Sequence, residues 1–322
     1  MLFLISETND PYFNLATEEF LLKDLDDDIL FIYSNNPCVI VGKHQNALAE
    51  VNYRFLIENN IPLIRRISGG GTVYHDLGNI NFSFFKNGVE GNLVNFRSFI
   101  EPVADFLAKT GISVDIGKRN DMLVNGLKVS GNAEHIFKKR TLHHGTLLFN
   151  SQLNNLRNAL KTVPGKYTDR AVKSVRSSVA NLSEFIQEQI TIDTFNLGLS
   201  QHLCQIFNTT PISLDQNTTS SIKKSINTKY SQWDWNYGYS PAYTFQVNVP
   251  IETYSISIDL KVEHGLIQEV HIDGDLPQKT KHLLEKSLIN LPHHFEKVDQ
   301  IINLSEINFP LDKKTELAWA FF

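Results

Sequence analysis

The chain has 322 residues, 42% of them hydrophobic and 11% aromatic, which is enough for one large domain or a large and a small one. Its 35 acidic and 30 basic residues give a net charge of −5, which argues against a general binder of nucleic acid or anionic membranes. The only cysteines, Cys38 and Cys204, lie far apart, no apolar run reaches the ~18 residues of a membrane span, and residues 1–10 lack the basic region of a signal peptide. We therefore expect a cytoplasmic protein with reduced thiols.

The first elements are a helix and two short strands. Asp10 followed by Pro11 predicts a helix start, because an acidic N-cap and a proline at the first helical position both favour one. The apolar runs 29–33 and 38–41, separated by Ser-Asn-Asn-Pro, predict a β-hairpin. The polar loop 42–46 that follows is either a ligand-facing loop or an ordinary turn.

Three consecutive glycines, Gly69 to Gly71, follow a short helix at 51–60 and a strand at 62–67. Glycine inside regular structure costs roughly 0.5–1 kcal/mol relative to alanine, so a triplet implies a special backbone path. Arg65 and Arg66 precede the triplet, and an apolar run begins at Val73. We interpret the stretch as an anion-receiving loop between two strands, with a mobile surface loop as the alternative.

Strands and hairpins dominate the next part of the chain. In 78–85 apolar residues alternate with Asn and Ser, which predicts a half-buried strand whose polar row faces a ligand. A helix at 93–109 and a strand at 112–116 follow. Asn125-Gly126 predicts a hairpin, and a second hairpin is expected at 133–149. This pattern predicts an α+β fold with a mainly antiparallel sheet.

The remaining sequence becomes helical from residue 153 and then changes character. Basic residues outnumber acidic ones at 161–176, and an aromatic, turn-rich cluster occupies 233–241. Further expected elements are an extended segment at 244–249, a hairpin at 255–272, and helices at 277–289 and 295–304. We place a domain boundary near residue 248, which predicts a catalytic domain at 1–247 and a small α+β domain at 248–322.

The glycine stretch matches neither common nucleotide motif. A Walker loop ends in Gly-Lys-Ser/Thr before a helix, whereas Thr72 and Val73 enter a strand. Tyr74 occupies the last glycine position of Gly-x-Gly-x-x-Gly, which excludes the dinucleotide fingerprint here. The adjacent His143 and His144 should point to opposite faces of a strand, and no His-Glu-x-x-His or Cys-x-x-Cys occurs. No protein metal site is predicted.

The remaining candidates for catalysis are the cysteines and a lysine. Cys38 begins an apolar strand and Cys204 lies on an apolar helical face, so both are expected to be structural thiols and not nucleophiles. Lys128 follows the Asn-Gly turn on a sheet. Such a lysine is either a solvated side chain or, near an anion loop, a bridge between two oxygens that gain charge together. Activation of a carboxylate by ATP needs such a bridge.

Several blocks of the sequence resemble the lipoate–protein ligase A family, in the family's order and over nearly the whole chain. They are residues 65–79, 119–121, 128–133, 143–148, 174–177, 181–182 and 235–241. Any single block would be a weak match, but the series is specific.

The resemblance implies a catalytic domain of the class II aminoacyl-tRNA synthetase and biotinyl-ligase fold with a small C-terminal domain. It implies that lipoate and ATP, with Mg²⁺, give lipoyl-AMP, and that a lysine of an acceptor lipoyl domain then receives the lipoyl group. The implied acceptors are the glycine-cleavage H protein and the acyltransferase subunits of 2-oxoacid dehydrogenases. A monomer without nucleic-acid or membrane partners is expected. The basic run 161–176 would cover the adenylate or meet an acidic acceptor, unless it is a solvated face.

The site residues follow from the same resemblance. The residues expected to hold the nucleotide phosphate and the acyl-adenylate are Arg66, Gly71, Thr72, Val73 and Tyr74. Asn120 and Asp121 would lie near the adenine, and Lys128 would bridge phosphate and carbonyl as the catalytic group. The expected lipoyl pocket contains Gly70, Gly71, His75, Lys128 and His144.

Three rival interpretations remain open at this stage. An octanoyltransferase of the same fold would use a cysteine thioester and no ATP, but neither cysteine is well placed for that role. A biotin ligase would need a glycine–arginine biotin loop, which the sequence lacks. A non-catalytic lipoate- or nucleotide-binding protein would not need Lys128.

Overall fold

The computed structural model describes residues 1–88, 96–118, 120–305 and 309–322, so Arg119 and the expected helix start at 93–95 lie outside it. The chain forms two compact units. Unit 1 comprises Met1–Lys43, Pro62–Arg157 and Ser174–Ser231, and unit 2 comprises His44–Ile61, Asn158–Lys173 and Gln232–Phe322. The boundary expected near residue 248 falls inside strand β14 (Tyr243–Ile251) of unit 2. The division into 1–247 and 248–322 stays a prediction.

Unit 1 holds the larger set of elements. Its strands are β1 (Leu2–Ile5), β2 (Ile29–Tyr33), β3 (Cys38–Val41), β4 (Leu63–Arg65), β5 (Val73–His75), β6 (Asn79–Asn87), β7 (Asp115–Ile116), β8 (Met122–Val124), β9 (Leu127–Lys128), β10 (Ser130–Phe137), β11 (Arg140–Leu148) and β13 (Pro211–Ile212). Its helices are α1 (Pro11–Lys23), α3 (Phe96–Lys109), η2 (Leu182–Glu184), α5 (Ile192–Phe207), α6 (Gln216–Ser225) and η3 (Ile226–Tyr230). Helix α4 (Leu153–Ala159) includes the residue at which the chain leaves unit 1.

The main sheet of unit 1 has six strands in the order β10-β11-β6-β2-β1-β13. The pairs β10–β11, β11–β6 and β6–β2 are antiparallel, and the pairs β2–β1 and β1–β13 are parallel. The predicted α+β fold with a mainly antiparallel sheet is therefore confirmed. The predicted hairpin of β2 and β3 is wrong. Strand β2 lies between β1 and β6, whereas β3 is the centre of a separate sheet of order β4-β3-β5. Both strands are buried along their whole length and take partners distant in sequence.

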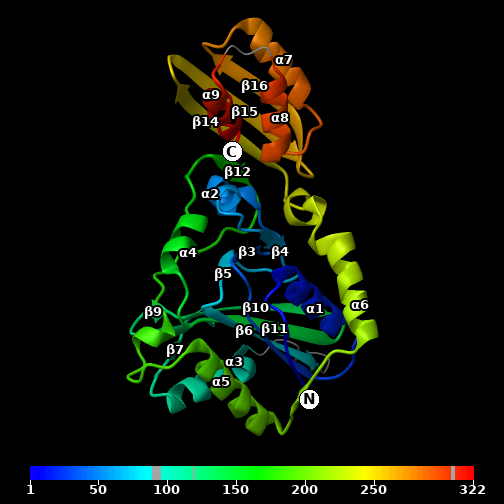
Figure 1. Cartoon of the computed structure of the whole chain (residues 1–322), viewed down its shortest axis with the longest axis vertical. Coiled ribbons are helices and arrows are strands. Elements are labelled where there is room, and N and C mark those ends of the chain that lie inside the picture. The colour runs from blue at the N-terminus through cyan, green and yellow to red at the C-terminus, as the bar shows by residue number, and fades with distance from the viewer. Residues whose placement is uncertain (89–95, 119, 306–308) are drawn as a thin grey trace. The chain divides into compact units, whose positions relative to one another are not determined.

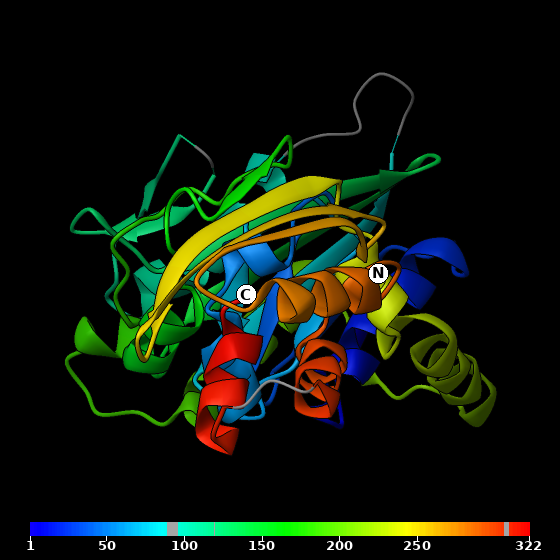
Figure 2. The ribbon, with the colours of Figure 1, turned by 90° about the horizontal axis from the view of Figure 1, so that it is seen from above.

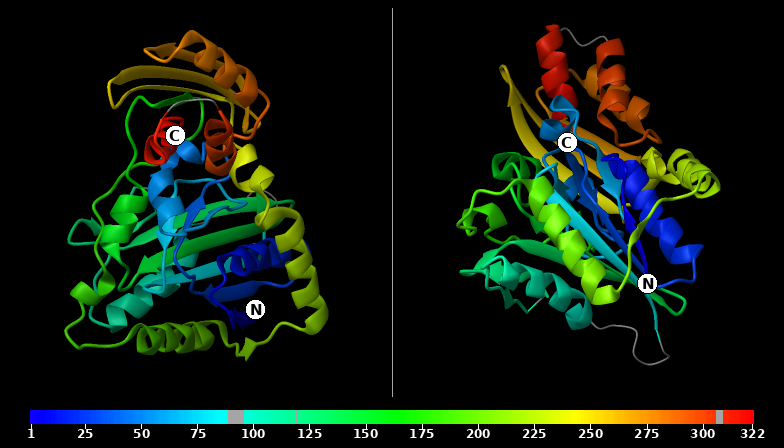
Figure 3. Two further views of the ribbon diagram at one scale, coloured as in Figure 1. Left: turned by 45° about the horizontal axis from the view of Figure 1, so that its top comes forward. Right: turned by 60° about the horizontal axis from the view of Figure 1, so that its bottom comes forward.

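The two faces of the main sheet have different chemistry. Ile80, Phe82 and Phe84 of β6 belong to the apolar core that includes side chains of α3 and α5. Helix α1 lies on the opposite face, as Figures 1 and 3 show. Fully burying one such aliphatic or aromatic side chain contributes roughly 1.5–3 kcal/mol, so the core face anchors the sheet.

The polar row of β6 is buried as well, and the prediction of a half-buried strand is therefore wrong. The alternation is present, but Asn79, Asn81 and Ser83 are each at most 1% exposed. Helix α1 packs over part of this face, where its Glu18 accepts a hydrogen bond from Ser83. Helix α1 itself begins as predicted, with the Asp10 carboxylate accepting from the Tyr12 N–H.

Both predicted hairpins of unit 1 are confirmed. Strands β8 and β9 pair antiparallel around Asn125 and Gly126, whose φ values of 50° and 77° are those that an Asn-Gly turn supplies. Strands β10 and β11 pair antiparallel over their whole length.

Unit 2 is built on an antiparallel sheet of order β12-β14-β15-β16. Its elements are η1 (Leu48–Glu50), α2 (Tyr53–Glu58), β12 (Tyr167–Asp169), η4 (Asp234–Gly238), β14 (Tyr243–Ile251), β15 (Tyr254–Glu263), β16 (Leu266–Gly274), α7 (Gln278–Leu288), α8 (Phe295–Leu304) and α9 (Leu311–Trp319). Figure 2 shows β14, β15 and β16 of this sheet in yellow and orange, with α7 beside them. The hairpin β15–β16 and helices α7 and α8 match the predictions, whereas α9 was not predicted. Among the described helices of either unit, none is long and apolar enough to cross a membrane.

Candidate functional site

The glycine stretch joins the two outer strands of the β4-β3-β5 sheet and lies against the start of β10. Gly70 has a φ of +86°, in the left-handed region that favours glycine. A Cβ atom on Gly70 would lie 3.0 Å from Arg66 Nη2 and 3.6 Å from the Cβ of Ala133 in β10. The loop therefore needs glycine for its backbone conformation and for close approach to the sheet.

Arg66 holds this loop from inside. Its Nη2 donates to the carbonyl oxygens of Gly69 (2.6 Å) and Gly71 (2.7 Å), and its Nη1 donates to the carbonyl of Ile40 (3.2 Å). Burial lowers the pKa of Arg66 to about 10, so the guanidinium stays charged at neutral pH. The side chain fixes the path of the glycine backbone and places a positive charge behind it. Its expected contact with a phosphate stays a prediction.

The opposite side of the loop contacts residues 174–177, another of the blocks that resemble the ligase family. The Thr72 N–H donates to Ser174 Oγ (2.8 Å), and a Cβ atom on Gly71 would lie 3.1 Å from the same oxygen. Val73 and Tyr74 then enter β5, where Tyr74 is buried. Two blocks that lie about a hundred residues apart in the sequence thus form one loop structure.

Lys128 lies next to this structure on β9. Its backbone is held on both sides, because its N–H donates to Ser178 and its carbonyl accepts from Ala180. Its Nζ forms an ion pair with the buried Asp121 at 3.6 Å. A Cβ atom on Gly131 would lie 3.8 Å from Thr146 Cγ2, 3.9 Å from Lys128 Cε and 4.0 Å from Val73 Cγ1, so these three side chains surround one position above β10. The structure thereby brings Lys128, Val73 and the glycine loop together.

The segment expected near adenine adjoins Lys128. Asn120 has a φ of 61°, and its carbonyl accepts a hydrogen bond from Asn132 Nδ2 (2.6 Å). The next residue, Asp121, pairs with Lys128 as described. Asn120 and Asp121 are therefore fixed beside the lysine, and their contact with a base stays a prediction.

His144 belongs to a buried network that no sequence motif predicts. Its Nε2 lies 2.7 Å from Ser68 Oγ, and its Nδ1 lies 3.0 Å from Glu18 Oε1. The same Glu18 oxygen accepts from Tyr33 (3.0 Å) and Ser83. Burial alone would raise the pKa of Glu18, but His144 and these hydrogen bonds outweigh it and lower the pKa. The network ties α1 to the glycine loop through Ser68.

The position of Glu18 in the sequence is a signal that it is buried. It falls on the same helical face of α1 as Leu15 and Leu22, which are buried, and it is 1% exposed. A carboxylate on an apolar stripe is rarely buried without a specific partner.

The other histidines have distinct settings. His75 Nδ1 lies 3.1 Å from Asn35 Nδ2. Burial, followed by the charge of Arg66, lowers the pKa of His75 to about 3, so it is neutral. His143 faces the other side of the sheet, as predicted, where its ring stacks on Phe99 with centroids 5.0 Å apart.

Neither cysteine has the environment of a nucleophile. Cys38 is fully buried, and burial raises the pKa of its thiol well above the ordinary value. Burial also raises the pKa of Cys204. Activated cysteines have lowered pKa values instead. In the described part of the chain, no three His, Cys, Asp or Glu side chains are grouped to hold a metal ion.

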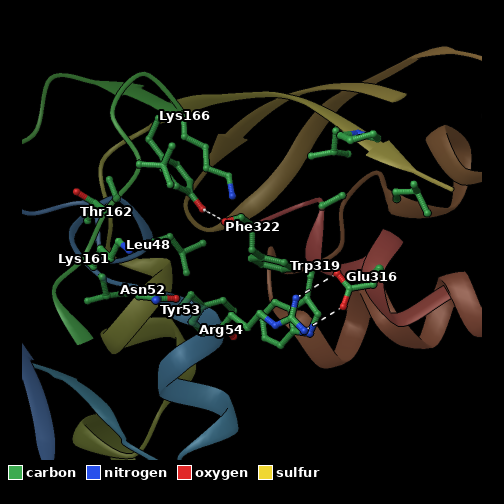
Figure 4. Close-up of a pocket in the computed structure, with 18 of the residues that line it drawn as sticks. Leu48, Asn52, Tyr53, Arg54, Lys161, Thr162, Lys166, Glu316, Trp319 and Phe322 are labelled. Atoms are coloured by element: carbon green, nitrogen blue, oxygen red, sulfur yellow. Dashed lines mark hydrogen bonds and ion pairs between the residues drawn. The ribbon is translucent and has the colours of Figure 1, made fainter. Parts of the chain in front are cut away.

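A cavity of about 680 Å³ lies within unit 2, and Figure 4 shows its lining. The residues that line the cavity include Lys161 and Lys166 of the basic run, together with Tyr53, Trp319 and Phe322. Burial lowers the pKa of Lys166, whose Nζ lies 5.4 Å from the centroid of the Phe245 ring. None of the expected site residues lines this cavity. Elsewhere in the basic run, Lys173 pairs with Asp169 at 2.7 Å.

Comparison with known proteins identifies the family. The profile of the lipoyl protein ligase A/B catalytic domain matches residues 10–204, and that of the bacterial lipoate protein ligase C-terminus matches residues 240–318. The chain is 40% identical over 284 residues to lipoate-protein ligase LplJ of Bacillus subtilis, covering 85% of each chain. It is also 38% identical over 309 residues to lipoate–protein ligase 1 of Staphylococcus aureus, covering 93% of each. The chain belongs to the lipoate–protein ligase family.

Solved structures of this family support the assignment. LipL1 of P. falciparum in complex with lipoate superposes with a TM-score of 0.64 at 27% identity, over 99% of each chain. A lipoate-protein ligase A bound with ATP gives a TM-score of 0.64 at 26% identity, over 74% of this chain and 98% of that one. A third structure, of a bipartite lipoate protein ligase and its E2 lipoyl domain from Thermoplasma acidophilum, gives 0.64 at 27% identity, over 74% and 96%. A lipoate–protein ligase fold is therefore assigned to this chain.

Proposed function

We propose that the protein activates lipoate with ATP to lipoyl-AMP and then transfers the lipoyl group to a lysine of an acceptor lipoyl domain. The observation that carries the proposal is the juxtaposition of Lys128, Val73 and the glycine loop around Gly131. A carboxylate and an α-phosphate that react there gain charge on adjacent oxygens, which one ammonium can stabilise. The ATP-bound and lipoate-bound relatives support both substrates.

In the first step the lipoate carboxylate attacks the α-phosphorus, a new oxygen–phosphorus bond forms, and pyrophosphate leaves with the electron pair of the broken bond. The Lys128 ammonium would neutralise the charge that develops on the phosphate oxygen. Asp121, 3.6 Å from this ammonium, orients the lysine side chain. Removing one such preorganised donor typically costs ~10²–10³-fold in rate.

In the second step a deprotonated acceptor lysine attacks the carbonyl carbon, and AMP leaves. The same Lys128 would stabilise the carbonyl oxygen as it gains charge. Arg66 would act on both steps through the loop, because its hydrogen bonds to the carbonyl groups of Gly69 and Gly71 fix the path of the glycine backbone. Acceptors of the proposed kind are the H protein and the E2 subunits, and the ligase structure described with its E2 lipoyl domain supports the latter.

Mg²⁺ is proposed as the partner of the ATP phosphates. The side chains fit this assignment, since Asp121 offers a carboxylate beside Lys128. Mg²⁺ in nucleotide sites commonly takes one or two carboxylates and completes its shell with phosphate oxygens and water. When bound, the ion would offset the charge of the leaving pyrophosphate.

The test is pyrophosphate release by the purified protein with ATP, Mg²⁺ and lipoate, octanoate or biotin in parallel. We expect release with lipoate and none with biotin. Lys128→Ala should lose the activity, whereas Lys139→Ala, which removes an exposed lysine of the β10–β11 turn, should retain it. No lipoate-dependent pyrophosphate from the wild type would refute the proposal. Acyl transfer from an acyl-carrier thioester without ATP would favour the octanoyltransferase instead.

A further inference from the structure

Asn81, at the centre of β6, is a buried amide without a hydrogen-bond partner. The residue is 1% exposed, and among the described residues neither its Nδ2 nor its Oδ1 has a partner. Its neighbours on the same face differ. Asn79 donates to Thr146 Oγ1 (3.2 Å) and accepts from Ser151 Oγ (2.9 Å), and Ser83 donates to Glu18. Buried polar groups are nearly always paired, so this exception requires an explanation.

The position of Asn81 connects it to the reaction centre. In the sheet register Asn81 is opposite Thr146 of β11, and Thr146 is opposite Gly131 of β10. These three residues form one row across the face that carries the glycine loop. Lys128 flanks Gly131 at one end of the row, and Asn81 lies two strand spacings away, about 10 Å. This separation suits an extended acyl chain whose carboxyl end is at Lys128.

We propose that Asn81 recognises the distal end of the acyl group, with its amide N–H donating to a sulfur of the dithiolane ring. The inference rests on the proposed function and assigns a specificity residue within that site. Divalent sulfur is a weak acceptor, and the amide is otherwise unpaired, so the contact satisfies a group that folding leaves without a partner. The amide oxygen remains available for an ordered water, a common partner of buried polar groups.

The consequence is discrimination between lipoate and octanoate, a straight-chain acid of the same carbon number without sulfur. Octanoate leaves the Asn81 amide unpaired, and a site built around a hydrogen bond disfavours an analogue that cannot make it. The rest of the row, Thr146 and Gly131, consists of small residues that would contact both acyl chains alike. Selectivity therefore depends on Asn81 rather than on the length of the site.

The test compares wild type with Asn81→Leu and Asn81→Ala. Binding of lipoate and octanoate is measured without ATP by titration calorimetry, and thermal unfolding is measured without ligand. The variants should lower the ratio of lipoate to octanoate affinity by about three- to tenfold, as expected for one weak hydrogen bond. Asn81→Leu should unfold no earlier than wild type, because it removes two unpaired buried groups. Ile80→Val, on the core face of the same strand, should leave the ratio unchanged.

The outcomes separate this inference from the proposed function. An unchanged ratio in both Asn81 variants would overturn the inference, even if wild type releases pyrophosphate with lipoate. A clear loss of stability in Asn81→Leu with the ratio unchanged would show a structural role for the amide. If wild type binds lipoate but releases no pyrophosphate, the ligase proposal fails while the affinity ratio still tests Asn81.

Discussion

Replacement of Lys128 by alanine tests whether its side chain serves catalysis or the stability of the fold. The side chain is 26% exposed and, among the described residues, makes one ion pair, at 3.6 Å with Asp121. Such a pair at a partly exposed position is worth about 1 kcal/mol or less. The backbone hydrogen bonds of Lys128 to Ser178 and Ala180 are unaffected by the substitution. Lys128→Ala should therefore retain nearly the full free energy of unfolding.

The activity of the same variant should fall by about 10²–10³-fold in each chemical step that the ammonium stabilises. Single-turnover release of pyrophosphate measures the first step, and transfer from chemically prepared lipoyl-AMP to an acceptor domain measures the second. Lys139→Ala is the control for loss of a lysine. If Lys128→Ala reacts at the wild-type rate in both assays, Lys128 is a solvated strand residue and the role assigned to it is wrong. A large loss of stability would instead show that Lys128 supports the fold.

Three further predictions concern the surroundings of the site. Arg66→Lys replaces the planar fork that bonds Gly69 and Gly71, so it should lower the free energy of unfolding by on the order of 3 kcal/mol in urea titrations; an unchanged value would show that the loop does not depend on these bonds. Because the pKa of Glu18 is depressed in the fold, its contribution to stability is present above the ordinary carboxyl value of 4.5 and is lost as the pH falls through the folded pKa. On acidification from about pH 7, the free energy of unfolding of Glu18→Gln should thus fall less than that of wild type. An equal fall in both would exclude Glu18 as a source of acid sensitivity. Cys38→Ala and Cys204→Ala should retain acyl transfer, and inactivity of either folded variant would favour a thioester mechanism.

Sequence patterns located the glycine loop well because its signals are local. The apolar runs on either side of the glycine triplet predict strands, and β4 and β5 are found there. The Asn125-Gly126 hairpin was predictable for the same reason, since its turn chemistry is contained in two residues. The hairpin expected at 29–41 is wrong because β2 and β3 pair with strands far along the chain. Local sequence signals do not specify such distant pairings.

The site was predictable only as a set of residues. The sequence identified Arg66 as a charge beside the loop, but its bonds to Gly69 and Gly71 depend on a fold of the loop that spacing does not specify. The buried pairing of His144 with Glu18 joins residues more than a hundred positions apart. Asn81 belonged to a polar row that was recognised. Its lack of a partner became visible only when its neighbours were found to be paired.

The central claim is transfer of a lipoyl group through an ATP-dependent acyl-adenylate. It is tested most directly by intact mass spectrometry of an E2 lipoyl domain after incubation with the protein, lipoate, ATP and Mg²⁺. We predict a mass increase of one lipoyl group that requires ATP, is absent when the acceptor lysine is replaced by arginine, and is lost in Lys128→Ala. An acceptor of unchanged mass with the wild-type enzyme, or a lipoyl adduct that forms equally without ATP, would contradict the account.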